Sequence, residues 1–144
     1  MPTYQYWHHH GAISVPDLEA AIAWYDSVLG FKLERRIRID AIPADVAFVR
    51  NGPLRMEIFQ VPEAHPLPDE RRIPNQDLKT HGNKHVSFAT DDVHALADEL
   101  RRRGADIVFV ADFEWGSNVF LRDNAGNLIE FVQEKPETET RAHL

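Results

Sequence analysis

The sequence contains one unit written twice, and this duplication limits the folds that the chain can adopt. His10 and Asp17 in the first half are matched by His85 and Asp92, in both cases 75 residues later. A constant offset of this kind indicates duplication of a supersecondary unit. Two such units, each with a face that it cannot bury alone, would pack together around a shared core.

Each copy predicts a strand, a helix and three further strands. In the first copy a strand over residues 4–15 leads into a helix that Asp17 caps and Gly30 ends. Asp92 and Gly104 take these two roles in the second copy. The later strands are expected at residues 31–41, 45–51 and 54–61, and at residues 106–112, 117–123 and 127–134. The pattern predicts an α+β fold of two tandem βαβββ modules.

The modules define one expected domain over residues 1–134, with module one at 4–61, a connecting loop at 62–83 and module two at 84–134. The loop carries four prolines and shows no sustained period. Long loops in compact domains are usually functional or disordered, so both a lid that contacts substrate and a plain connector stay open. Residues 135–144 are rich in Glu and Thr and are expected to form a frayed tail.

Composition excludes several classes of protein. A chain of 144 residues with 43% hydrophobic and 27% charged residues is typical of a soluble globular domain. A net charge of -7 argues against a nucleic-acid surface, which needs a basic face. No apolar stretch approaches the ~20 residues of a membrane span, and the absence of cysteine excludes disulfides and thiolate metal sites. We expect a cytoplasmic protein that binds neither nucleic acid nor membrane.

Four side chains in the same register of the repeat indicate a metal site. Strand residues alternate between two faces, which places His10 and His85 on the face away from the helices. Glu57 and Glu130 each stand between apolar neighbours, where an unpartnered carboxylate costs several kcal/mol if it is desolvated. A divalent cation binds imidazole nitrogens and carboxylate oxygens together and offsets both negative charges. The alternative is that the glutamates face solvent and the histidines are merely hydrogen-bonded, but recurrence of all four favours the metal.

Two more histidines precede His10 on the expected strand. Alternation places His8 on the face of His10, at the mouth of the site, and points His9 to the opposite face. We prefer His10 as the ligand because it alone aligns with His85 relative to the capping aspartates.

The sequence resembles the vicinal oxygen chelate superfamily, which includes glyoxalase I, methylmalonyl-CoA epimerase, extradiol ring-cleaving dioxygenases, and fosfomycin and bleomycin resistance proteins. The similarity covers residues 8–133 and rests on four segments, at residues 10–18, 24–31, 84–92 and 123–130. It implies a glyoxalase-like fold, with paired βαβββ modules that form an open, curved mixed sheet around a metal. In metal-dependent members the ligands come from the first and fourth strands of each module, here His10, Glu57, His85 and Glu130.

Resemblance to glyoxalase I at all four ligand positions implies a metal-dependent isomerase or lyase. In that enzyme one divalent metal ion (Zn, Ni, Co, Mn or Fe(II) here) binds two neighbouring oxygens of a small-molecule substrate and stabilises an enediolate, while a glutamate moves the proton. Glu57 or Glu130 would be this catalytic base. Methylmalonyl-CoA epimerase is also similar, but it usually has glutamine at the position of Glu57.

Two alternatives stay open. An Fe(II)-dependent extradiol-type dioxygenase needs two histidines and one carboxylate, which His10, His85 and Glu130 would supply. Glu57 would then fill a position that oxygen chemistry needs open. A non-enzymatic small-molecule (antibiotic) binding protein is disfavoured, because all four ligands are retained. The family and the need to cover sheet edges also imply a homodimer.

Overall fold

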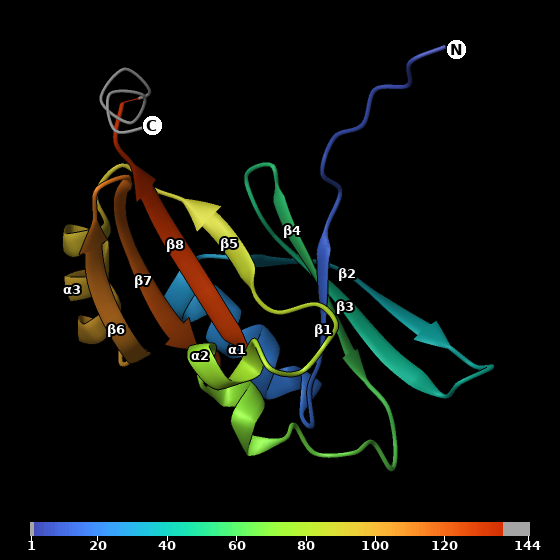
Figure 1. Ribbon diagram of the computed structural model, residues 1–144. Helices are drawn as coiled ribbons and strands as arrows, with labels where there is room; N and C mark the ends of the chain where they lie inside the picture. Colours follow the sequence, from blue (N-terminus) through green and yellow to red (C-terminus); the bar gives the residue numbers. More distant parts are fainter. Residues whose placement is uncertain (1, 137–144) are drawn as a thin grey trace. The chain divides into compact units, whose positions relative to one another are not determined.

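The computed structural model describes residues 2–136 (Figure 1). Most of the predicted tail over residues 135–144 therefore lies outside the described residues. The chain divides into two compact units, one formed by Met1–Asp26 with Gly30–Ala64 and the other by Ser27–Leu29 with His65–Leu144. Each unit contains one module, and the single domain over residues 1–134 stays a prediction.

The first unit holds a mixed four-stranded sheet. Its elements in chain order are β1 (Gly11–Ser14), α1 (Leu18–Leu29), β2 (Lys32–Ile39), β3 (Ala44–Asn51) and β4 (Leu54–Gln60). The strand order is β1-β4-β3-β2, with β1 parallel to β4 and the other pairs antiparallel. Strand β4, which carries Glu57, is therefore an inner strand, hydrogen-bonded on both sides.

The second unit repeats this plan after two short helical turns. Its elements are η1 (Asp69–Arg72), α2 (Pro74–Asp77), β5 (Val86–Ala89), α3 (Val93–Arg102), β6 (Asp106–Phe113), β7 (Gly116–Arg122) and β8 (Leu128–Glu134). The strand order β5-β8-β7-β6 matches that of the first unit. The predicted α+β class and the βαβββ order of both modules are confirmed, with one four-stranded sheet in each module. None of the described helices is long and apolar enough to cross a membrane.

The two main helices begin and end as the sequence predicts. The carboxylates of Asp17 and Asp92 each accept a hydrogen bond from the backbone N–H three residues later, at 3.1 and 3.0 Å. These bonds satisfy donors that a helix leaves free in its first turn. Gly30 and Gly104 follow the helices with φ of 71° and 83°, in the left-handed region that favours glycine.

Glutamines from the fourth strands provide a second pair of caps. The backbone N–H of Leu18 donates to Gln60 Oε1 at 2.6 Å, and that of Val93 donates to Gln133 Oε1 at 2.9 Å. These bonds join each helix start to the strand that carries the glutamate of its module. The sequence pattern did not predict them, because they link residues 40 or more positions apart.

The helix of the second unit lies on one face of its sheet. Val93 and Ala97 of α3 form a buried cluster with Val119 of β7, against which Phe131 of β8 packs. Because neighbouring residues on a strand face opposite sides, Glu130 lies on the face away from α3.

The first strand is shorter than predicted. Sequence alternation predicts a strand over residues 4–15, whereas β1 begins at Gly11 and ends at Ser14, and residues 4–10 have no regular structure. The register of β1 with its partner β4 runs only from Gly11 to Ser14. A strand needs a partner for its backbone N–H and C=O groups, so alternation ends where the pairing ends.

The connecting loop over residues 62–83 contains ordered turns held by a buried carboxylate. Asp77, only 2% exposed, accepts a hydrogen bond from Arg71 Nε at 3.0 Å and one from Lys84 Nζ at 3.2 Å. Lys84 Nζ also donates to the backbone oxygen of Asp77 at 2.6 Å. This cluster, which we call the Asp77 clamp, ends one residue before His85. The clamp anchors the end of the loop within the second unit.

Replacement of Gly116 by alanine is expected to destabilise the β7–β8 pair. Gly116 has φ of 153°, and a Cβ there would lie 2.0 Å from the backbone oxygen of Gln133, closer than atoms can approach. We expect a loss of about 2 kcal/mol or more in the free energy of unfolding, measured by urea denaturation. Gly52→Ala is the matched control, because φ there is 57° but nothing lies within 4 Å of the added Cβ. Equal losses in both variants would show that the close contact is unimportant.

Candidate metal centre

The first unit brings His10 and Glu57 together. His10 Nε2 lies 3.5 Å from Glu57 Oε1. The parallel pairing of β1 with β4 sets Ala12 opposite Glu57, and His10 comes two residues earlier. The imidazole packs edge-on against the ring of Phe48, with 5.3 Å between centroids. The two side chains are 31% and 19% exposed, so both are partly buried yet open to a ligand.

The second unit repeats this arrangement with His85 and Glu130. His85 Nε2 lies 3.6 Å from Glu130 Oε1. Ser87 is opposite Glu130 in the register of β5 with β8, and the imidazole packs edge-on against Phe120 at 4.8 Å. The same donor atoms therefore meet at nearly the same separation in both modules.

These separations fit a shared divalent ion. Two donors that each lie about 2.0–2.2 Å from a tetrahedral ion are roughly 3.4 Å apart, close to the 3.5 and 3.6 Å between histidine and glutamate. Imidazole nitrogen and carboxylate oxygen both suit Zn, Ni, Co, Mn and Fe(II). Each pair thus provides two donors of suitable type and spacing for the expected metal.

A row of directly opposed residues crosses each sheet at the glutamate, one residue from each strand. In the first unit this row is Ala12, Glu57, Phe48 and Arg35. In the second unit it is Ser87, Glu130, Phe120 and Phe109. The first row and the second row agree at glutamate and phenylalanine and differ at both ends.

The two glutamates differ in how they are held. Ser87 Oγ donates to Glu130 Oε1 at 2.8 Å, and Asn118 Nδ2 donates to Glu130 Oε2 at 2.9 Å. In the first unit Ala12 and Val46 occupy the corresponding register positions, and neither side chain can donate a hydrogen bond. Both oxygens of Glu130 are therefore oriented by protein donors that Glu57 lacks.

The structure corrects the prediction for His9. Alternation points His9 away from His10, but His9 Nδ1 lies 2.7 Å from His10 Nδ1, because residues 4–10 are not a strand. One ring therefore donates to the other, and the contact leaves His10 Nε2 facing Glu57. Histidines that bind metals commonly hold their second ring nitrogen in this way.

Each unit, taken by itself, assembles two of the four predicted ligands. Among residues 2–136, no group of three or more His, Asp and Glu side chains is gathered in a position to hold a metal ion. The four-ligand set of His10, Glu57, His85 and Glu130 therefore stays a prediction, and a complete site requires the two pairs to meet.

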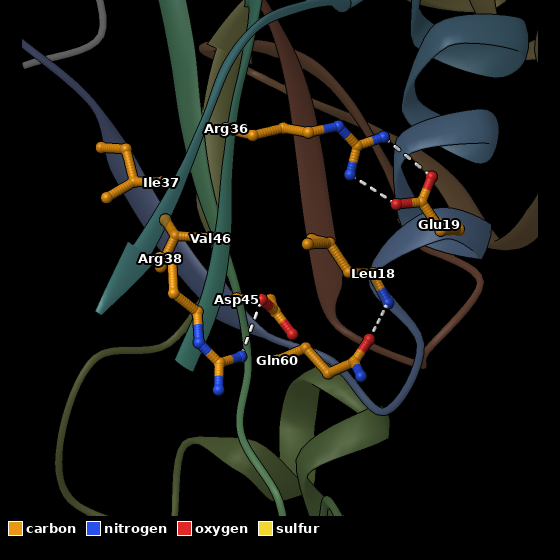
Figure 2. A pocket seen from close by; sticks show the side chains of 8 residues that line it. All are labelled: Leu18, Glu19, Arg36, Ile37, Arg38, Asp45, Val46 and Gln60. Atoms are coloured by element: carbon orange, nitrogen blue, oxygen red, sulfur yellow. Dashed lines mark hydrogen bonds and ion pairs between the residues drawn. The ribbon is translucent and has the colours of Figure 1, made fainter. Parts of the chain in front are cut away.

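A hollow of about 560 Å³ in the first unit lies apart from these ligands (Figure 2). Arg36 Nη2 donates to Glu19 at 2.9 Å, and Arg38 Nη1 donates to Asp45 at 2.9 Å. Figure 2 shows both arginines turned toward these partners, whereas Ile37 lies on the other side of β2. Since its arginines are already paired with carboxylates, the hollow offers no free cation. Its lining residues are Leu18, Glu19, Arg36, Ile37, Arg38, Asp45, Val46 and Gln60.

A serine, an aspartate and a histidine also meet in the second unit, but not as a nucleophilic triad. Ser117 Oγ donates to Asp112 Oδ1 at 2.6 Å, and His94 Nε2 lies 2.8 Å from the same oxygen. The Asp112 carboxylate raises the pKa of His94, while the bond from Ser117, followed by that from His94, lowers the pKa of Asp112. Because the serine donates to aspartate and not to histidine, no base activates its hydroxyl. The cluster joins α3 to β6 and β7.

Sequence reasoning missed the hydrogen-bond donors around Glu130. Ser87 is recognisable only as a small residue on the face of His85, and Asn118 only as part of the repeat. A comparison of the two copies does contain a signal, because polar Ser87 and Asn118 replace apolar Ala12 and Val46 at equivalent positions. An apolar-to-polar difference beside a duplicated ligand indicates a changed environment for that ligand.

The fold and these pairs define a class of protein, an α+β chain of duplicated βαβββ modules with one His/Glu pair in each. The sequence matches the Glyoxalase/Bleomycin resistance protein/Dioxygenase superfamily over residues 7–131. The chain therefore belongs to this superfamily, and the predicted family is confirmed.

Curated relatives include epimerases and lyases. The chain is 31% identical to human mitochondrial methylmalonyl-CoA epimerase over 97 residues, 66% of this chain and 52% of the relative. It is 30% identical to lactoylglutathione lyase of Neisseria meningitidis over 139 residues, 93% of this chain and 95% of the relative. The chain spans about half the length of the mammalian epimerases that it matches. At the level of the family, these relatives support an enzyme.

Solved structures share the fold. A glyoxalase family protein from Enterococcus faecalis has a TM-score of 0.74 at 19% identity, covering 88% of this chain and 97% of that chain. A glyoxylase/bleomycin resistance protein/dioxygenase domain from Frankia sp. EAN1pec has a TM-score of 0.74 at 22% identity, covering 92% and 100%. At these identities the likeness shows the fold alone.

Proposed function

We propose that this protein is a metal-dependent isomerase or lyase that moves a proton on a small-molecule substrate with two neighbouring oxygens. The observation that carries this proposal is the pair of matched contacts, His10 with Glu57 and His85 with Glu130, at 3.5 and 3.6 Å. The names of the relatives, methylmalonyl-CoA epimerase and lactoylglutathione lyase, support the same type of reaction.

The residues of the chain divide the work. His10, Glu57, His85 and Glu130 would hold one divalent ion, which when bound supplies a Lewis acid that stabilises negative charge on substrate oxygens. A carboxylate within reach of the substrate C–H takes the proton and returns it. Glu130 receives two hydrogen bonds that hold it in place, whereas Glu57 contacts His10. Phe48 and Phe120 form apolar walls beside the histidines.

The reaction class is tested by solvent exchange. The metal-loaded protein is incubated in deuterium oxide with α-hydroxy and 2-methyl thioesters, and deuterium at the carbon next to the carbonyl is followed by mass spectrometry. We expect incorporation that stops when a chelator removes the metal. Oxygen consumption with catechols, together with no exchange on any thioester, would contradict the proposal and indicate a ring-cleaving dioxygenase.

Removal of the Ser87 hydroxyl is expected to weaken metal binding. Ser87→Ala deletes one of the two donors that orient Glu130, and loss of such a partner typically lowers metal affinity by about 10–100-fold. Competition with a chromogenic chelator measures this change. Ser117→Ala is the matched control, because that hydroxyl donates to Asp112 instead. Equal affinities in the wild type and Ser87→Ala would show that Glu130 is not a ligand that depends on this bond.

Two further expectations belong to this proposal. A homodimer would cover sheet edges such as β2, in which all but the last residue is exposed. A cytoplasmic location stays a prediction from composition.

A further inference from the structure

The first row ends in an arginine that has no carboxylate partner. Arg36, Arg38, Arg50 and Arg55 each form an ion pair with a nearby carboxylate. Among the described residues Arg35 forms none, and its guanidinium carbon instead lies 4.7 Å from the centre of the Phe48 ring. A guanidinium stacked on an aromatic face keeps its N–H groups free at the edge.

Arg35 lies on the same face of the sheet as the first pair of candidate ligands. Arg35 is directly opposite Phe48, and Phe48 is directly opposite Glu57. Opposed residues in a sheet share a face. Arg36 extends to the other side of β2 to reach Glu19, as Figure 2 shows. The free guanidinium therefore belongs to the candidate metal centre and not to the hollow of Figure 2.

The distance to His10 suits a single small substrate. The ring of Phe48 lies 4.7 Å from the Arg35 guanidinium carbon and 5.3 Å from the centre of the His10 ring. Together these two distances place the guanidinium within about 10 Å of the imidazole. A molecule whose oxygens are held at His10 and Glu57 can thus extend along Phe48 to Arg35.

The second row has no such cation, because Phe109 stands at the position of Arg35 and packs on Phe120 at 5.2 Å between centroids. The two ends of the site are therefore chemically different, with a cation in the first unit and an aromatic ring in the second.

We propose that Arg35 is a specificity-determining residue that binds a carboxylate on the substrate, at a distance from the two oxygens held by the metal. The inference rests on the proposed function and adds the substrate class: an anionic molecule with a terminal carboxylate. A guanidinium binds a carboxylate through two parallel N–H bonds, and its position on Phe48 fixes the direction from which the anion approaches.

The test compares two probes that share one metal-binding group. Acetohydroxamate presents two adjacent oxygens and no carboxylate, whereas succinohydroxamate adds a carboxylate on a short chain. Both are titrated calorimetrically into the Zn²⁺-loaded protein. We expect the wild type to prefer succinohydroxamate by about tenfold, the effect of one charge-assisted contact. Arg35→Gln is expected to lose this preference while its affinity for acetohydroxamate and for Zn²⁺ stays unchanged.

Two variants control for charge and packing. Arg36→Gln removes the same charge from the next position, on the other face of β2, and is expected to keep the preference. Arg35→Phe copies Phe109, which retains an aromatic contact with Phe48 without the charge, and is expected to lose it. A preference that persists in both Arg35 variants, or is absent from the wild type, would overturn the inference while acetohydroxamate binding upholds the metal site. Failure of both probes to bind the loaded wild type would overturn the proposed function and this inference together.

Discussion

Replacement of His85 by alanine is expected to lower the affinity for Zn²⁺ by more than about 100-fold, beyond the 10–100-fold loss typical of an outer partner. His85 Nε2 lies 3.6 Å from Glu130 Oε1, the spacing of two donors on one ion. Without the imidazole, Glu130 would have to bind the ion from its module alone. Chelator competition gives the affinity, and deuterium exchange on the thioester panel is expected to disappear with the metal.

The duplicated arrangement provides the controls for this experiment. His10→Ala is expected to have the same effect, because His10 occupies the same position beside Glu57. His94→Ala removes an exposed histidine of the second unit that contacts Asp112, and should leave metal binding unchanged. If His85→Ala weakened binding but His10→Ala did not, the first pair would not be part of the site.

Glu57 distinguishes the two enzymatic classes within the same series. Under proton transfer with four ligands, Glu57→Gln is expected to reduce turnover by about 10²–10⁴-fold, the range for loss of an acid–base group. Turnover that survives this change would instead favour a three-ligand site of His10, His85 and Glu130.

Replacement of Asp77 by asparagine is expected to destabilise the second unit by about 3 kcal/mol, since removal of one partner leaves buried charge uncompensated. Asp77 is 2% exposed and accepts bonds from both Arg71 and Lys84. The partners are partly exposed, at 31% and 19%, which keeps the expected loss near the lower end for a buried pair. The change is measured as a shift in the midpoint of urea unfolding.

Asp98→Asn is the matched control for the Asp77 clamp. Asp98 pairs with Arg101 at 3.1 Å on the exposed face of α3, where both side chains are more than half exposed. Exposed pairs of this kind contribute about 0–1 kcal/mol. Equal, small effects from the two substitutions would show that the Asp77 clamp does not stabilise the loop.

Much of the fold follows from the repeat. Asp17 and Asp92 predict the helix starts, Gly30 and Gly104 predict the ends, and the structure bears out all four. These signals are local, because a cap bonds within its own first turn and a left-handed residue needs only its own backbone. Positions that repeat at a constant offset also bring each histidine to its glutamate.

Features that depend on distant partners escaped prediction. The start of β1 depends on where β4 offers it a hydrogen-bonding partner, and the alternation of residues 4–10 carries no such information. The turns η1 and α2 have four residues each, too few to show a helical period. The bonds to Glu130 come from β5 and β7. Their partners are set by register, which a local pattern does not reveal.

The glutamine caps make the register of β4 and β8 self-checking. In β4, Gln60 reaches the start of α1, while Glu57, three positions earlier, meets His10 from the opposite face. Because side chains alternate along a strand, a slip of one residue sends both to the wrong faces. A misaligned strand would therefore leave the amide of Leu18 uncapped at the same moment as it withdraws the carboxylate from the imidazole. Correct folding of each half and readiness to bind an ion would rise and fall together.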